Sequence, residues 1–193
     1  MTPRDTQRTF LAVDIDEETR RRLAGLPERV DDHDAKVRWV EPRNLHITLN
    51  FLGDVSGDTL ADICELAGVC AAEVERFEFR VQGVQPVPPD GRKLRMFWAG
   101  VDEPSGRLIE LQGKLSDAMS ELGLRREDRA YRPHVTLARV KSTKNPDRLR
   151  SAVAGLGEED FGAVLCENIT VYTSELGPNG PVYTAVATPP LGK

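Results

Sequence analysis

The alternation of hydrophobic and polar positions divides the chain into short segments with strand or helix periodicity. Residues 45–52 and 134–137 alternate polar and apolar side chains, as expected for strands with one buried face. Apolar residues at helical spacing predict helices over 56–75 and 105–123. Further strands are predicted over 9–15, 37–40, 77–84, 93–101, 164–174 and 182–188, and further helices over 16–27 and 146–156.

A proline-rich segment separates two similar successions of strands and helices. Residues 85–91 hold Pro86, Pro88 and Pro89, which predict a loop. The order strand, helix, motif strand, helix, strand precedes this loop, and a similar order follows it. A repeat of two α+β lobes explains the pattern, with the lobe boundary near 85–92. Two related lobes would place one motif strand on each side of a shared cleft.

One tetrapeptide pattern occurs in both halves of the chain. It reads His46-Ile47-Thr48-Leu49 in the first half and His134-Val135-Thr136-Leu137 in the second. On a strand, the histidine and threonine share one face and the two apolar residues share the other. A single copy is typical of an ordinary half-buried strand. The probability that two of the three histidines carry a threonine two positions later by chance is about one per cent. The duplicated pattern therefore favours paired acid–base chemistry on a phosphate.

Charge and cysteine content restrict the classes of function. The net charge of −5 argues against a protein that coats long nucleic acid, although residues 125–144 hold a local excess of arginine and lysine that could attract an anion or remain solvated. No apolar run is long enough to span a membrane, and no apolar leader core follows Met1, so a cytoplasmic protein is expected. Cys64, Cys70 and Cys166 are expected to be reduced thiols.

These residues resemble the two-histidine (2H) phosphoesterases, in particular the LigT-type RNA 2′,3′-cyclic phosphodiesterases, formerly described as 2′-5′ RNA ligases. The resemblance covers nearly the whole chain. Besides the two motifs, it rests on 10–14, 37–40, Phe97-Trp98-Ala99-Gly100-Val101 and 174–176. It implies an α+β fold over residues 1–193, a single domain of two pseudo-symmetric lobes. Each lobe would be an antiparallel sheet with helices on its outer face, around a central cleft.

The resemblance also implies a reaction and the residues that perform it. A terminal 2′,3′-cyclic phosphate would be opened to a 2′-phosphate without metal or cofactor. His134 would be the base that activates water, and His46 the acid that protonates the departing 3′ oxygen. Thr48 and Thr136 would hydrogen-bond the phosphate oxygens. The residues alone do not decide which histidine is the acid.

Two further positions gain roles from the resemblance. Arg139 stands five residues after His134 and would bind phosphate, and Phe51 stands five after His46 and would stack on a base. Strict alternation places both on the core side, so these roles require each strand to end, twist or bulge. Phe51 could equally be a core residue. Further candidates are Arg132 as a second phosphate contact, Phe10 as a cleft residue and His33 as a surface residue whose polar loop could hold a metal.

The expected partners are RNA termini or small cyclic-phosphate nucleotides, bound by a monomer. Reversible 2′-5′ ligation and hydrolysis of ADP-ribose cyclic phosphate are alternatives within the same chemistry. A non-catalytic binder of RNA ends or nucleotides is an alternative of another class. A two-histidine metal site is a third, which the lack of a carboxylate in either motif disfavours.

Overall fold

The computed structural model describes residues 6–30, 33–89, 93–126, 129–178 and 180–193. These residues form nine strands, five α-helices and one short 3-10 helix. The strands are β1 (Thr6–Asp14), β2 (Ala35–Trp39), β3 (His46–Ser56), β4 (Phe77–Val87), β5 (Met96–Asp102), β6 (His134–Thr143), β7 (Asp160–Cys166), β8 (Thr170–Gly177) and β9 (Gly180–Ala187). The helices are α1 (Glu17–Ala24), α2 (Leu26–Arg29), η1 (Pro42–Asn44), α3 (Gly57–Ala72), α4 (Arg107–Glu121) and α5 (Pro146–Ala154).

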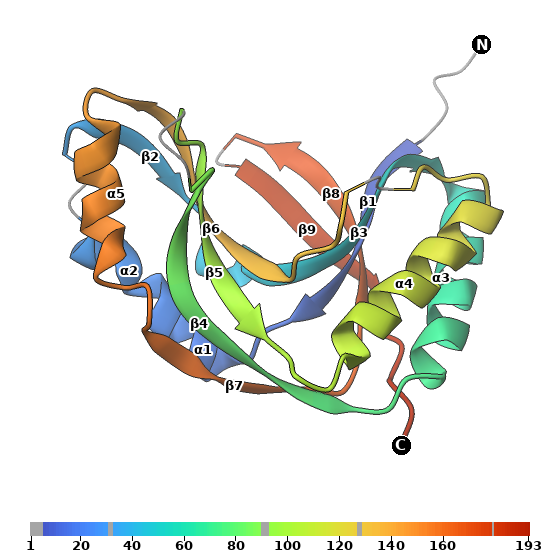
Figure 1. Ribbon diagram of the computed structural model, residues 1–193. Helices are drawn as coiled ribbons and strands as arrows, with labels where there is room; N and C mark the ends of the chain where they lie inside the picture. The colour runs from blue at the N-terminus through green and yellow to red at the C-terminus, as the bar shows by residue number, and fades with distance from the viewer. Residues whose placement is uncertain (1–5, 31–32, 90–92, 127–128, 179) are drawn as a thin grey trace, which may run out of the picture.

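All the strands belong to one antiparallel sheet. Its order is β7-β4-β5-β6-β3-β1-β8-β9, and β2 pairs with β6. The two motif strands, β3 and β6, are neighbours in the middle and share the single Cα pair Ile47–Val135. Figure 1 shows a strongly curved sheet, with β2 and β4–β7 to one side of this junction and β1, β3, β8 and β9 to the other. The predicted α+β class is therefore confirmed.

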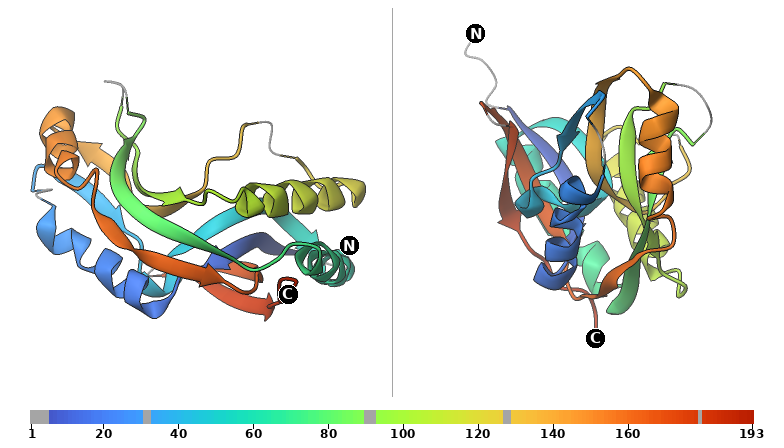
Figure 2. Two further views of the ribbon diagram at one scale, coloured as in Figure 1. Left: turned by 60° about the horizontal axis from the view of Figure 1, so that its bottom comes forward. Right: turned by 90° about the vertical axis from the view of Figure 1, so that its left-hand side faces the viewer.

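The helices pack at the two ends of the curved sheet. Helices α3 and α4 lie against each other and against β3, whereas α1 contacts β7 and α5 contacts β4 (Figures 1 and 2). Asp16 caps the N-terminus of α1, because its carboxylate accepts a hydrogen bond of 2.8 Å from the backbone N–H of Thr19. Among the described residues, none of the helices combines the length and apolar character needed to cross a membrane.

Two sequence predictions are wrong in the region of the sheet edges. The loop predicted from Gln85 begins later, because β4 continues to Val87 and pairs with β5. Pro86 is tolerated there because β7 pairs with β4 only as far as Gln82, so no neighbouring strand on that side requires the missing N–H. The single strand predicted over 164–174 is two strands, β7 and β8, which lie in different halves of the sheet. Asp90 and Gly91 of the predicted loop lie outside the described residues.

Candidate active site

The two motif strands present their histidines and threonines beside the central junction of the sheet. Ile47 and Val135 are fully buried, and the apolar residues that follow each threonine are buried as well. His46, Thr48, His134 and Thr136 are half-buried on the opposite face. The predicted alternation is therefore confirmed, and it places both polar pairs on the two strands that adjoin in the middle of the sheet.

Each motif strand has a bulge at the residue that follows the threonine. In the ladder with β1, Thr48 is opposite Ala12 and Asn50 is opposite Leu11, so Leu49 has no Cα partner. In the ladder with β5, Leu137 is skipped in the same way. A one-residue bulge reverses the face of the residues that directly follow it. The expected roles of Phe51 and Arg139 required each strand to end, twist or bulge, and the structure contains a bulge in both strands.

The bulges bring Phe51 and Arg139 to the face that carries the motif side chains. Phe51 is 69% exposed, so the alternative that it belongs to the core is wrong. Arg139 is exposed as well, after the consecutive buried pair Leu137 and Ala138. Its Nη1 lies 3.8 Å from the Met96 sulfur.

Both histidines are oriented by a backbone carbonyl two residues earlier. Nδ1 of His46 lies 2.7 Å from the Asn44 oxygen, and Nδ1 of His134 lies 2.8 Å from the Arg132 oxygen. A carbonyl oxygen only accepts, so Nδ1 carries the hydrogen in both rings. Nε2 is then the atom that changes protonation state: it is a base in the neutral ring and an acid in the cation. Each histidine can therefore transfer a proton through its own Nε2.

His46 lies in an aromatic pocket with a carboxylate at its base. Its ring centroid is 5.0 Å from that of Phe10 and 5.6 Å from that of Tyr183, and its Nε2 is 3.0 Å from the Thr48 hydroxyl. Burial lowers the pKa of His46, with the backbone carbonyl of Asn44 and then the charge of Asp14 opposing this effect and the charge of His134 adding to it. The influence of His134 on this pKa is consistent with the adjoining positions of the two motif strands.

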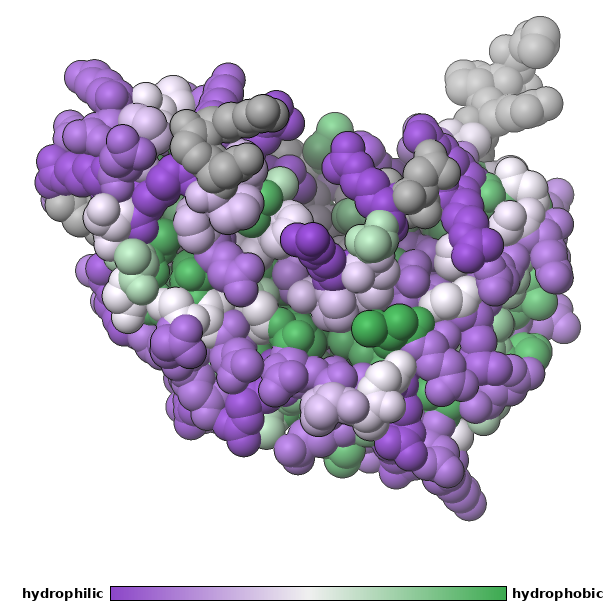
Figure 3. Space-filling model, in the orientation of Figure 1, coloured by the Kyte–Doolittle hydropathy of each residue, from purple (hydrophilic) through white to green (hydrophobic). Residues whose placement is uncertain are grey.

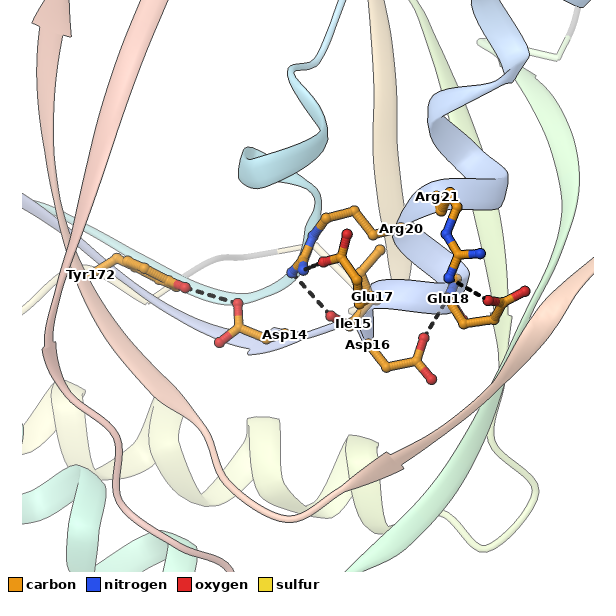
Figure 4. Close-up of polar contacts among 9 residues, drawn as sticks. Asp14, Ile15, Asp16, Glu17, Glu18, Arg20, Arg21 and Tyr172 are labelled. Carbon is orange, nitrogen blue, oxygen red and sulfur yellow. Dashed lines mark hydrogen bonds and ion pairs between the residues drawn. The ribbon is translucent and has the colours of Figure 1, made fainter.

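Asp14 is held by two hydroxyl donors from the neighbouring strand. Its carboxylate accepts hydrogen bonds of 2.7 Å from Thr170 and 2.8 Å from Tyr172. Figure 4 shows Tyr172 reaching Asp14 from β8, close to the start of α1, where Arg20 donates to the Ile15 carbonyl. Burial and the adjacent Asp14 raise the pKa of the Tyr172 phenol, so this tyrosine stays a neutral donor.

His134 has a different environment, dominated by one aromatic ring. The indole of Trp98 is stacked on the imidazole with the ring centroids 3.7 Å apart and the planes inclined by 19°. Burial lowers the pKa of His134, and its bond to the Arg132 carbonyl opposes that effect. The stack and the carbonyl together fix the plane of the ring.

A cavity of about 260 Å³ opens beside these residues. Its lining combines six residues of the motif strands β3 and β6 with residues of β2, β9 and the segment between β2 and β3: Arg38, Trp39, Val40, Glu41, Asn44, His46, Thr48, Phe51, Thr136, Arg139, Lys141, Pro181 and Tyr183. Seen as in Figure 1, the surface of the molecule is mainly hydrophilic and is hollowed at its upper edge (Figure 3). The cavity can therefore offer imidazole, hydroxyl and positively charged groups to one anionic ligand.

The structure brings five of the six predicted site residues into one cavity. His46, Thr48, Phe51, Thr136 and Arg139 line it, and His134 lies beside it on β6. Phe10 packs against His46 and is only 3% exposed, so its ring is covered and does not line the cavity. The Arg132 side chain is exposed and does not line the cavity. The expectation that His33 is a surface residue is confirmed.

Several site residues were not assigned a role from the sequence. Trp98, Arg38 and Trp39 lie within segments that carried the family resemblance, which was the available signal for them. Tyr183 lies on β9 and reaches the site only through the pairing of β8 with β1. Lys141 belongs to the basic segment 125–144, whose charge was noted without a position in the site.

The described residues contain no group of three or more histidine, cysteine, aspartate or glutamate side chains placed to hold a metal ion. Asp31 and Asp32, which flank the polar loop of His33, lie outside the described residues. The three cysteines are free thiols, and burial raises the pKa of Cys166 to about 12.

Comparisons with known proteins agree with one another. The family model of the 2′-5′ RNA ligase superfamily matches residues 15–177. An RNA 2′,3′-cyclic phosphodiesterase of Methanothermobacter thermautotrophicus is 37% identical over 92% of this chain and 95% of its own length. One of Archaeoglobus fulgidus is 35% identical over 91% and 96%.

Solved structures show the same fold. The crystal structure of a Thermus thermophilus protein, TT0787, has a TM-score of 0.81 at 28% identity, covering 96% of this chain and 99% of that one. The structure of Escherichia coli LigT complexed with 3′-AMP has a TM-score of 0.76 at 24% identity, covering 98% and 100%.

Proposed function

Because the chain belongs to the 2′-5′ RNA ligase superfamily and is an RNA 2′,3′-cyclic phosphodiesterase, we propose that His46 and His134 open the cyclic phosphate by general acid–base catalysis. The observation that carries this mechanism is the matched orientation of the two rings. In both, a backbone carbonyl holds Nδ1–H and leaves Nε2 as the proton-transfer atom.

His134 acts as the base in this mechanism. Its lowered pKa keeps the ring neutral near neutral pH, so Nε2 is ready to accept a proton from water. The water oxygen forms a bond to phosphorus as its proton passes to His134. Trp98 holds the ring plane during this step through the 3.7 Å stack.

His46 acts as the acid. As the bond from phosphorus to the 3′ oxygen breaks, the Nε2–H of His46 protonates that oxygen, which leaves as a hydroxyl. The phosphate remains on the 2′ oxygen, and the two histidines exchange protons with solvent before the next cycle. Burial lowers the pKa of His46 as well, but the Asn44 carbonyl and the charge of Asp14 oppose this effect by favouring the charged ring, which is the form that an acid requires.

Thr48, Thr136 and Arg139 bind the phosphate oxygens. All three line the cavity, and a hydroxyl or guanidinium donor held in place stabilises the charge that develops on the phosphoryl group. The exposed ring of Phe51 stacks on the base of the terminal nucleotide. The partners are RNA ends and small nucleotides with a cyclic phosphate, and no step requires a metal or cofactor.

The site belongs to a domain of two lobes, each an antiparallel half-sheet with outer helices. The single Cα pair between β3 and β6 supports a division at the centre of the sheet. The two halves of the sheet do not coincide with the two halves of the sequence. The late strands β8 and β9 lie on the side of β1, and the early strand β2 pairs with β6. We expect the protein to act as a monomer, which light scattering would measure.

Other substrates share this chemistry. The same two histidines could run the reaction backwards and join RNA ends through a 2′-5′ bond, and they could open ADP-ribose cyclic phosphate. Hydrolysis at RNA ends is preferred because the similar proteins of two archaea are named as RNA 2′,3′-cyclic phosphodiesterases. The same names disfavour the non-catalytic alternative.

The test is hydrolysis of nucleoside 2′,3′-cyclic monophosphates and of a short RNA with a cyclic end, in EDTA, with the product isomer identified. We expect a 2′-phosphate from both substrates. His46→Ala and His134→Ala should each abolish turnover without unfolding the protein. His33→Ala is the matched control, because His33 is exposed and outside the cavity.

Three results would contradict the proposal. A 3′-phosphate product would reverse the orientation of the substrate. Full activity in either histidine variant would remove that residue from the mechanism. Loss of activity in EDTA, restored by a divalent cation, would favour a metal site.

A further inference from the structure

The end of the cavity beyond the two threonines carries more positive charge than one cyclic phosphate requires. Arg139 and Lys141 reach this end from β6, and Arg38 reaches it from β2. A 2′,3′-cyclic phosphate carries one negative charge, which Thr48, Thr136 and Arg139 can bind. Arg38 and Lys141 are two further cations that line the same cavity.

The strand pairing concentrates these charges. Arg38 and Arg139 are Cα partners in the ladder between β2 and β6, so the two arginines lie directly opposite each other. Like charges at directly opposite positions of an antiparallel pair are destabilising. Glu41, the one carboxylate among the described residues that line the cavity, forms an ion pair of 2.6 Å with Arg43. The arrangement is suited to an anion that lies between the strands.

The backbone leaves space for the Arg38 guanidinium. A Cβ added to Gly180 would lie 2.6 Å from Nη2 of Arg38, so a side chain at Gly180 would displace the guanidinium. Gly180 also has a φ of 137°, in the region that favours glycine. Gly180, the first residue of β9, therefore lies against the Arg38 guanidinium and precedes Pro181 of the cavity wall.

Strand β6 sets the spacing between the two anion positions. Lys141 lies two residues beyond Arg139, which is about 7 Å along a strand at about 3.3 Å per residue. This separation is of the order of the distance between successive phosphates of a nucleic acid chain. A ligand with two phosphates on one ribose can therefore reach Arg139 with one phosphate and Lys141 with the next.

We propose that Arg38 and Lys141 form a second phosphate subsite, which binds the phosphodiester on the 5′ carbon of the terminal nucleotide. The preferred substrate is then the end of an RNA chain, and a free nucleoside 2′,3′-cyclic phosphate lacks one of the two anions. This inference rests on the proposed function, because it places the terminal cyclic phosphate at the two threonines.

The test compares two ligands that differ only in the 5′ diester. These are adenosine 2′-monophosphate and the same compound carrying a 5′-methyl phosphate. We expect the native protein to bind the second about five- to tenfold more tightly in calorimetry, because it adds a charge-assisted contact at a partly exposed site. The advantage should shrink with added salt, because screening weakens the attraction between the diester and the two cations.

Variants then locate the contact. Lys141→Gln and Arg38→Gln should each reduce the advantage of the diester ligand severalfold. The matched control is Lys36→Gln, because Lys36 is an exposed cation on the same strand as Arg38 but does not line the cavity. Equal affinity of the native protein for the two ligands would overturn the subsite, and so would an unchanged advantage in both Lys141→Gln and Arg38→Gln.

Hydrolysis is measured on the corresponding cyclic phosphates with and without the 5′ diester. Because binding of the two product-like ligands does not require turnover, it tests the subsite even if the two-histidine mechanism fails. Turnover that survives in His46→Ala or His134→Ala would contradict the mechanism, whereas equal kcat/KM for the two cyclic substrates in the native protein would contradict the subsite.

Discussion

Thr48 and Thr136 occupy matching positions in the two motifs, yet the structure predicts unequal effects when each is replaced by valine. The Thr48 hydroxyl is 3.0 Å from Nε2 of His46 and donates to it when the ring is neutral, so in the free enzyme this hydroxyl must turn away from Nε2 before it can donate to a phosphate oxygen. The Thr136 hydroxyl makes no hydrogen bond within the part of the chain that the structure describes. Binding of substrate therefore replaces an existing bond at Thr48 but adds a new one at Thr136.

The magnitudes follow from the strength of a hydrogen bond to a charged group. Such a bond contributes about 1.5–3 kcal/mol, so Thr136→Val should cost about 2 kcal/mol, or about 30-fold in kcat/KM. At Thr48 the lost bond to His46 offsets part of this contribution. The net cost of Thr48→Val should be about 1 kcal/mol, or about fivefold. Valine keeps the branched shape on the strand, so unfolding free energies should change by less than about 1 kcal/mol.

The assay is steady-state hydrolysis of a nucleoside 2′,3′-cyclic phosphate by both variants and by the double variant, with thermal melts to check the fold. Thr143→Val is the control, because Thr143 is half-buried on β6 and does not line the cavity. An effect at Thr48 equal to or larger than that at Thr136 would refute the reasoning. It would mean that the bond between Thr48 and His46 does not compete with substrate.

Two further predictions concern pH and the exposed ring. The dependence of kcat/KM on pH should be bell-shaped, because it falls in acid as His134 gains a proton and in alkali as His46 loses one. Burial lowers the pKa of both histidines, so the pH of maximal kcat/KM should lie below 6.5. Since bound phosphate favours protonated His46, kcat should fall at a higher pH than kcat/KM; activity that rises steadily into alkali would contradict His46 as the acid. Phe51→Ala should raise KM about fivefold with little change in kcat or stability, because base–aromatic stacking contributes about 1–3 kcal/mol and the ring is 69% exposed. An unchanged KM would remove Phe51 from the base contact.

Much of the site could be predicted from side-chain alternation. The tetrapeptides at His46 and His134 fix which side chains share a face, and that is a local property of a strand. Alternation fails beyond the threonines, because the bulges at Leu49 and Leu137 arise in the ladders with β1 and β5. The roles of Phe51 and Arg139 required bulges whose sites no local pattern marked.

Contacts between distant strands were the part that sequence reasoning missed. Trp98 stacks on His134 because β5 pairs with β6, and Tyr183 meets His46 through three successive ladders, β9–β8, β8–β1 and β1–β3. The loop predicted over 85–91 failed for a related reason. A proline rule describes the local chain, but Pro86 lies where β4 has a neighbour on one side only. Register and strand order decide such contacts.

The order of strands also has a consequence for synthesis on the ribosome. His46 is translated early, but the ring of Tyr172 and the hydroxyl of Thr170 that hold Asp14 belong to β8, and Tyr183 belongs to β9. These strands emerge last, and pairings between residues so far apart in sequence form slowly. A nascent or C-terminally shortened chain that contains both histidines therefore lacks the wall behind His46. Phosphodiesterase activity should therefore appear only after β8 has docked on β1, later than the synthesis of both motifs.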